Sequence, residues 1–217
     1  MSSPWESMGE LLGTIMIAGI RELIAALPKV ELHVHLVGSA SIDTVLGLAR
    51  RHPERGVPTD DAALRSFYEF TDFAHFIDVY LAVNSLVTSG RDVTALLVGL
   101  ARDQAACNIR YSEVTVTPTA HLSVGIEADE LADALTEGRR IARRDHGVEL
   151  AWIFDIDGSA GPAGGPATLE WVLRHRPEGT VALGLGGPED GVPREMYREQ
   201  FMAARDAGLH LVPHAGE

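Results

Sequence analysis

Cysteine and lysine are each present only once in this sequence of 217 residues. Because Cys107 has no second thiol to pair with, an intrachain disulfide is excluded, and a reducing cytoplasm is the simpler location for the chain. Aromatic residues make up only 6% of the chain, whereas hydrophobic residues reach 46%. A core built mainly on alanine, valine and leucine is typical of a soluble α/β protein, and the length suits one domain over residues 1–217.

Positive charge is also scarce. The chain carries 18 Lys and Arg residues against 31 Asp and Glu residues, a formal net charge of −13. A surface of this sign repels nucleic-acid phosphates and anionic membranes alike. We therefore expect a small-molecule partner, with neither nucleic acid nor membrane; the composition does not determine the oligomeric state.

The sequence lacks a long uninterrupted apolar segment. The segment most similar to one is Leu11–Leu27. It follows two acidic residues rather than a basic run and is interrupted by Arg21 and Glu22. A secretory signal peptide has the opposite charge arrangement, and a membrane span needs about 20 predominantly apolar residues. We predict an N-terminal helix that packs on the domain following it.

What the chain does contain is an alternation of short apolar runs with longer amphipathic segments. The short runs predict strands at Val30–Leu36, Ile109–Thr117, Leu150–Ile156, Val181–Leu185 and Leu209–Pro213. Segments with apolar residues every three or four positions predict helices near Ile42–Arg51, Asp72–Val87, Asp92–Cys107, Ala128–His146, Ala167–His175 and Arg194–Ala207.

Strands that alternate with helices predict a parallel sheet, either open and doubly wound or part of a barrel. A dinucleotide-binding open sheet needs Gly-x-Gly-x-x-Gly after its first strand, and Leu36-Val-Gly-Ser-Ala40 does not supply it. This absence favours a (β/α)₈ barrel, of which the chain contains about five β/α units.

Histidines follow a regular spacing in Glu31-Leu-His-Val-His-Leu36. His33 and His35 are two residues apart on a predicted strand, so their side chains point to the same face, with the intervening apolar residues toward the helices. Two imidazoles on one face can bind one zinc ion, each at about 2.0–2.1 Å. The alternative is a pair of ordinary exposed histidines.

A second motif, His214-Ala-Gly-Glu217, follows the fifth predicted strand. In a (β/α) barrel the carboxyl ends of strands converge, so His214 would join the first two histidines as a third metal ligand. Glu217 could move protons beside the metal without binding it. An ordinary histidine at a strand end remains the alternative for His214 alone.

Four motifs together resemble the adenosine deaminase family of the amidohydrolase superfamily. They are Leu27-Pro-Lys-Val-Glu-Leu-His-Val-His-Leu36 with Gly38, Tyr111-Ser-Glu-Val-Thr-Val-Thr-Pro118, Val181-Ala-Leu-Gly-Leu-Gly-Gly-Pro-Glu189 and His214-Ala-Gly-Glu217. The resemblance extends from Leu23 to the end of the chain, and the motifs occur in the family's order.

The resemblance implies an eight-stranded barrel with one zinc ion that removes ammonia from a 6-aminopurine nucleoside by hydrolysis. By this resemblance His33, His35 and His214 bind zinc, and Glu217 is the catalytic proton shuttle that protonates N1 of the ring. Gly187, or its neighbour Gly186, offers a backbone N–H to a ring nitrogen. Zinc makes hydroxide available near neutral pH for attack on C6.

Weaker expectations concern an aromatic segment and one acid. Phe70, Phe73 and Phe76 would form an apolar lid over the substrate, although their spacing of three is also typical of an ordinary core stripe. Asp155 ends the third strand, where it could touch substrate or cap a helix.

Val37 departs from the family pattern. Adenosine deaminases have an aspartate here that binds the sugar hydroxyl, and valine cannot make that bond, which is worth about 0.5–1.5 kcal/mol. His-Leu-Val-Gly-Ser-Ala-Ser resembles the branch acting on 6-aminodeoxyfutalosine in the futalosine route to menaquinone. That substrate is preferred over adenosine.

The family pattern also extends beyond Glu217, with three more strands, a further histidine and an aspartate that is the fourth zinc ligand. We therefore expect a truncated barrel that is inactive in isolation. Two other interpretations stay open: a different amidohydrolase, disfavoured because the single Lys29 precedes the first strand, and an inactive metal-binding pseudoenzyme.

Overall fold

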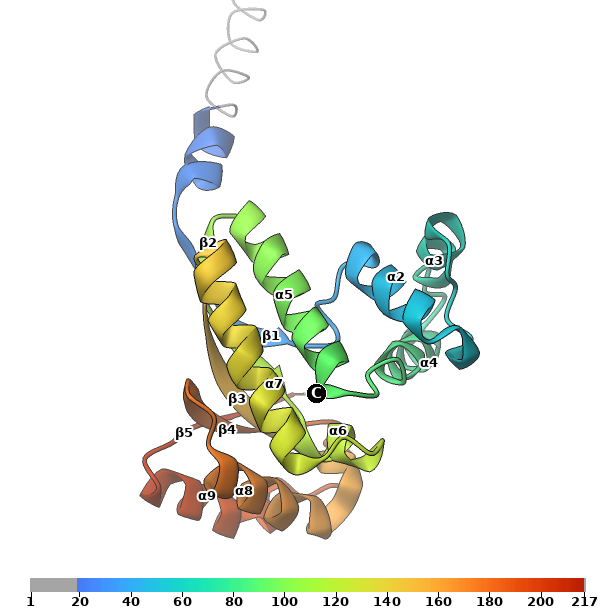
Figure 1. Ribbon diagram of the computed structural model, residues 1–217. Coiled ribbons are helices and arrows are strands. Elements are labelled where there is room, and N and C mark those ends of the chain that lie inside the picture. Colours follow the sequence, from blue (N-terminus) through green and yellow to red (C-terminus); the bar gives the residue numbers. More distant parts are fainter. Residues whose placement is uncertain (1–18, 217) are drawn as a thin grey trace, which may run out of the picture.

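The computed structural model describes residues 19–216. Five parallel strands form one sheet in the order β1-β2-β3-β4-β5, which is also their order in the sequence (Figure 1). The strands are β1 (Lys29–His35), β2 (Ile109–Val116), β3 (Glu149–Asp157), β4 (Thr180–Gly186) and β5 (His210–Pro213). All five predicted strands are confirmed to within a few residues.

The sequential strand order decides between the two predicted architectures. A doubly wound sheet reverses its strand order at a switch point, whereas a barrel adds each new strand beside the last. Here every strand pairs in parallel with its successor, and the helices contact the sheet from the outside. The chain therefore forms a five-stranded curled part of a (β/α) barrel, as predicted.

The two faces of the sheet differ in chemistry. On β3, the residues Trp152, Phe154 and Ile156 belong to the buried core that the helices cover. The alternate residues Ile153 and Asp155 are also buried but point to the concave face, because successive side chains of a strand point to opposite faces. The concave face is therefore where polar groups can gather.

The helices that cover the sheet begin and end near the predicted positions. They are α5 (Gly90–Ala106), α7 (Ala128–Ile141) continued by a π turn (Ala142–His146), α8 (Gly164–His175) and α9 (Arg198–Asp206). Two short helices, α3 (Asp61–Phe67) and α6 (Pro118–Ser123), and short 3₁₀ turns at Pro53–Arg55 and Gly158–Ala163 were not predicted. The first turn of the helix predicted near Arg194–Ala207 is a 3₁₀ turn, Arg194–Tyr197.

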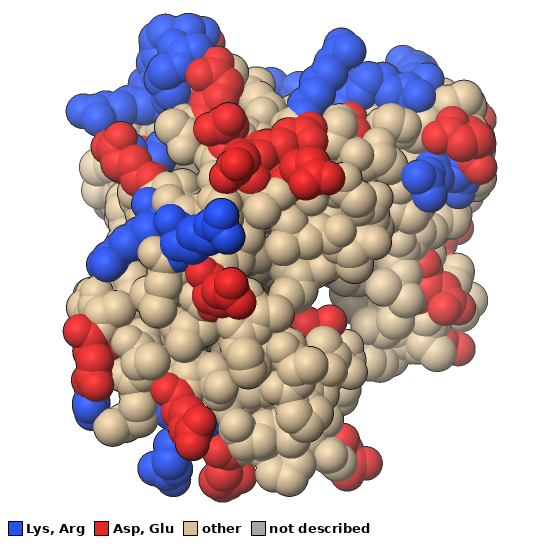
Figure 2. All heavy atoms as spheres, turned by 60° about the horizontal axis from the view of Figure 1, so that its bottom comes forward, with Lys and Arg blue, Asp and Glu red and all other residues tan. Residues whose placement is uncertain are grey.

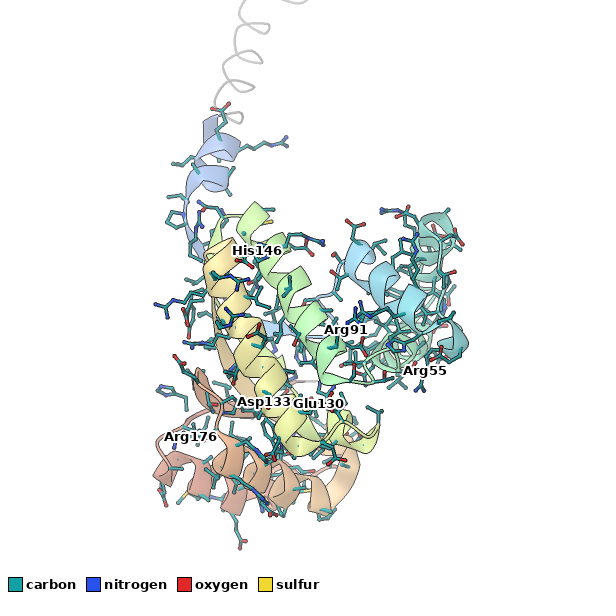
Figure 3. The ribbon with its side chains drawn as sticks, viewed as in Figure 1. Arg55, Arg91, Glu130, Asp133, His146 and Arg176 are labelled. Carbon is teal, nitrogen blue, oxygen red and sulfur yellow. The ribbon has the colours of Figure 1, made fainter. Side chains whose placement is uncertain are left out.

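Close packing of α5 against α7 stabilises the convex face. A Cβ atom on Gly138 would meet the Leu97 side chain, so only glycine permits this helix separation. At the other end of the contact, the Gly90 N–H donates to Glu130 Oε1 over 2.6 Å (Glu130 is labelled in Figure 3). This pair satisfies a free N–H in the first turn of α5.

The connection from β1 to β2 forms a lobe beside the barrel (Figure 1). It consists of α2 (Ile42–Arg51), α3 and α4 (Phe73–Asn84), and it joins the barrel through α5. Asp92 anchors this junction, since its carboxylate accepts hydrogen bonds from Arg51, His52 and Ser89. The lobe is thereby placed beside the carboxyl end of β1.

The N-terminal helix differs from its prediction. Residues 19–26 are helical, and residues 11–18 of the predicted segment lie outside the described residues. The packing prediction is wrong for the described part, because Ile20, Leu23 and Ile24 are all about half exposed. The helix precedes β1 at the amino-terminal end of the barrel and projects away from it (Figure 1), so no described helix or strand covers its apolar face.

One detail of β1 also differs. Val34 packs on the core and Leu36 is buried, as expected, but Leu32 is 58% exposed. The register of β1 against β2 slips between Glu31 and Val34, and β1 is an edge strand of the described sheet. The helices therefore cover only the carboxyl-terminal part of the outer side of β1.

The surface agrees with the acidic composition. On the face shown in Figure 2, acidic side chains are spread widely, and basic ones lie along the upper margin, across the left side and at the other edges, without a continuous basic surface. Within residues 19–216, no helix has the length and apolar character needed to cross a membrane.

Candidate metal centre

Three histidines from the two ends of the described sheet meet at its carboxyl edge. His33 Nε2 lies 3.2 Å from His35 Nε2, which in turn lies 3.2 Å from His214 Nε2. The ring centroids of His33 and His214 are 4.8 Å apart although these residues come from β1 and from the segment after β5. Curvature of the sheet brings these distant strands together, so the predicted triad does assemble.

The spacing of the three rings suits a zinc ion. Two nitrogens bound at about 2.0–2.1 Å to a tetrahedral zinc ion lie about 3.3 Å apart. The two Nε2 separations of 3.2 Å, from His35 to each of the other two histidines, are close to this value, and the ligand atoms of all three histidines lie within 4.8 Å of one another. Three neutral imidazoles are a donor set that zinc prefers, so these residues can hold one such ion.

An open hollow of about 560 Å³ lies beside the triad. His33 and His214 form part of its wall, and the remaining lining residues come from β5 and the segment after it. Glu217, the predicted proton shuttle, lies outside the described residues. Its role stays a prediction.

Gly187 follows directly after β4, at the same edge of the sheet as the histidines. Its φ angle is +90°, a region that favours glycine, and its carbonyl accepts a 2.7 Å hydrogen bond from Arg194. Gly186 is the last residue of β4. The contact of either glycine with a purine remains a prediction.

The three phenylalanines of the predicted lid are at the surface. Phe70, Phe73 and Phe76 are 46%, 75% and 39% exposed, so they do not form the core stripe that was the alternative interpretation. Phe76 contacts both others, with ring centroids 5.3 Å from Phe70 and 5.8 Å from Phe73. Exposed aromatic rings that contact one another are available to cover a ligand.

Sequence reasoning missed Tyr80, which extends this group of rings toward the segment after β1. Its ring lies 6.4 Å from that of Phe76, and we call Phe70, Phe73, Phe76 and Tyr80 the aromatic cluster. A Cβ atom on Gly38 would lie 3.8 Å from both the Tyr80 ring and His35 Cβ. Burial, and then the charges of Asp155 and Asp157, raise the pKa of Tyr80, so its hydroxyl stays protonated. In the sequence, its position one helical turn after Phe76 could have indicated that the two rings lie on the same side of a helix.

Val37 is buried, with 8% exposure, and belongs to the hydrophobic core. Its apolar side chain therefore offers no hydrogen bond. Asp155 is only 2% exposed, and its Oδ2 lies 3.8 Å from His214 Nε2. This proximity distinguishes it from a helix-capping residue.

Comparison with known proteins agrees with this geometry. The adenosine deaminase family model matches residues 28–217. The chain is 48% identical over 200 residues to aminodeoxyfutalosine deaminase of Streptomyces avermitilis, covering 91% of this chain and 56% of that protein. It is 32% identical over 200 residues to adenine deaminase of Cupriavidus metallidurans, covering 92% of this chain and 56% of the relative.

Solved structures give the same result. A Burkholderia ambifaria amidohydrolase with bound Zn superposes with a TM-score of 0.78 at 30% identity, over 91% of this chain and 54% of that one. The chain thus spans about half the length of the relatives it matches. The matched family, the strand order and the assembled histidine triad agree, and the chain belongs to the adenosine deaminase family.

Proposed function

We propose that the protein is a zinc-dependent hydrolytic deaminase that converts the 6-amino group of a purine nucleoside to a 6-oxo group and releases ammonia. The observation that carries the proposal is the histidine triad at the carboxyl edge of the sheet, with Nε2 separations of 3.2 Å. In (β/α) barrels this edge is where catalytic groups gather. Family membership supports deamination as the reaction.

In this proposal each residue has a separate task. His33, His35 and His214 hold one zinc ion, which when bound supplies the Lewis acidity that makes water nucleophilic near neutral pH. Glu217 takes a proton from that water and delivers it to N1 of the ring, so that C6 becomes electrophilic. It later helps ammonia leave. Water contributes the oxygen, and the C6–N bond is the one that breaks.

The proposed substrate is 6-aminodeoxyfutalosine. Val37 supports it, because its buried apolar side chain cannot bond a sugar hydroxyl as an aspartate would. The Streptomyces avermitilis relative, at 48% identity, carries the same activity in its name. Two competitors remain. Adenosine would need another residue to replace the lost hydrogen bond, and adenine is suggested by the 32% identical adenine deaminase.

The test is a side-by-side assay of the intact, zinc-loaded protein with 6-aminodeoxyfutalosine, adenosine and adenine, following loss of the 6-aminopurine absorbance. We expect the futalosine compound to be preferred by at least tenfold in kcat/KM, about 1.4 kcal/mol in transition-state binding. A preference for adenosine or adenine would overturn the substrate assignment. Absence of turnover on all three would favour the pseudoenzyme or another amidohydrolase.

A further inference from the structure

Two carboxylates, Asp92 and Asp155, are buried among the described residues, and their surroundings differ. Asp92 lies at the start of α5, where arginine, histidine and serine side chains donate hydrogen bonds to it. Asp155 lies on the concave face of the sheet. It is two residues after Ile153 on β3 and therefore nearer to the carboxyl edge. Its neighbour there is His214, with Oδ2 3.8 Å from Nε2.

Asp155 reaches His214 by lying across β4, which separates β3 from β5. In the sheet register Asp155 is beside Gly184, and Gly184 is beside Val212, two residues before His214. A Cβ atom on Gly184 would overlap Asp155 Oδ1, and one on Gly186 would lie 3.0 Å from Asp155 Oδ2 and 3.6 Å from His214 Cε1. Two glycines on one face of β4 thus leave the space that the carboxylate occupies.

The alternative task of capping the next turn is already performed by Asp157. Its Oδ1 accepts hydrogen bonds from Ser159 N at 2.8 Å and from Ser159 Oγ at 2.6 Å. Asp155 Oδ2 lies instead 3.8 Å from His214 Nε2, so a cation held by that nitrogen would be its close neighbour.

We propose that Asp155 strengthens binding of the cation at the metal centre. Its carboxylate lies on the Nε2 side of the His214 ring, 3.8 Å from the nitrogen that would bind the metal, and adds negative charge beside the cation, so that the triad binds the metal more tightly. The inference rests on the proposed metal centre and requires no particular substrate. Outer partners that surround the ligands of a metal site typically contribute 10- to 100-fold to metal affinity.

The test compares Asp155→Asn with the matched control Asp157→Asn in the intact protein. Both variants remove one negative charge from the end of β3, but only the first removes it from the side of His214. Zinc affinity is measured by competition with a chromophoric chelator, and the cobalt-substituted proteins are compared by visible absorption. We expect a 10- to 100-fold weaker zinc affinity and a changed cobalt spectrum for Asp155→Asn, with a change below about twofold for Asp157→Asn.

A second variant, Gly184→Ala, keeps the carboxylate but fills its space. Displacement of Asp155 by the added methyl group should weaken zinc binding in the same direction. Thermal melts of the metal-free proteins identify any variant that fails to fold. If wild type binds zinc and Asp155→Asn binds it equally well, the inference is wrong. If wild type binds no zinc, the metal centre itself, and with it the proposed function, is wrong.

Discussion

At the scale of single residues, Asp92 connects stability to pH. Burial alone would raise the pKa of this carboxyl, but hydrogen bonds from Arg51, Ser89, His52 and the Thr88 N–H outweigh it and lower the pKa to about 2. The unfolded value is near 3.8. A lowered pKa stabilises the fold above the unfolded value, and this contribution is lost as the pH falls through the native one.

We therefore expect Asp92→Asn to reduce the free energy of unfolding by on the order of 1–2 kcal/mol at pH 7. This is less than the full pKa shift would give, because water reaches the Arg51 side chain and screens its interaction with Asp92. Urea denaturation of wild type and variant at pH 7 and pH 3 measures it. The difference between the two proteins should shrink at pH 3. Asp61→Asn, which removes an exposed partner of Arg65, is the control and should change stability little at either pH. An equal difference at both pH values would contradict the assignment.

At the scale of elements, α4 presents two exposed aromatic rings of the aromatic cluster, Phe73 and Phe76. Side chains that cover a bound ligand change KM more than they change folding, because they are already exposed in the free protein. We expect the double variant Phe73→Ala with Phe76→Ala to raise KM by roughly three- to tenfold and to leave the thermal midpoint almost unchanged. Steady-state kinetics with the preferred substrate and a thermal melt measure both quantities.

Leu81 provides the matched control on the same helix. It is 55% exposed and is not a member of the aromatic cluster. Leu81→Ala should therefore leave KM unchanged. Equal KM values for Leu81→Ala and the phenylalanine variant would indicate a general effect of α4 rather than a covering role for the aromatic cluster.

At the scale of the whole molecule, the proposed metal centre joins the first and last strands of the described sheet. His33 and His35 come from β1 and His214 follows β5, so a bound ion would connect two segments about 180 residues apart in the chain. A ligand that binds only the folded state stabilises it in proportion to the logarithm of its concentration. Zinc should therefore raise the melting temperature.

At a free zinc concentration of about 100 times Kd the expected stabilisation is about 2.7 kcal/mol, or roughly 5–10 °C in Tm. Scanning calorimetry with and without zinc, and after chelation, measures the shift. His214→Ala should abolish it, whereas His210→Ala, which changes an exposed histidine on β5 itself, should retain it. A shift that persists in His214→Ala would mean that zinc binds elsewhere.

The sequence by itself determined the strands, most of the helices and the candidate metal-ligating histidines, because these depend on local periodicity and on motifs a few residues long. His33 and His35 share a face by the two-residue repeat of a strand, wherever that strand lies. Only the tertiary structure decided which residues are exposed and which side chains from different strands meet. These depend on the curvature of the sheet and on which elements pack against each segment. Leu32 and the N-terminal helix remain exposed because nothing described covers them. Asp155 lies near His214 because the sheet curls and because β4, between them, has glycines beside the Asp155 carboxylate. This arrangement involves three strands, so no single segment of the sequence contains it.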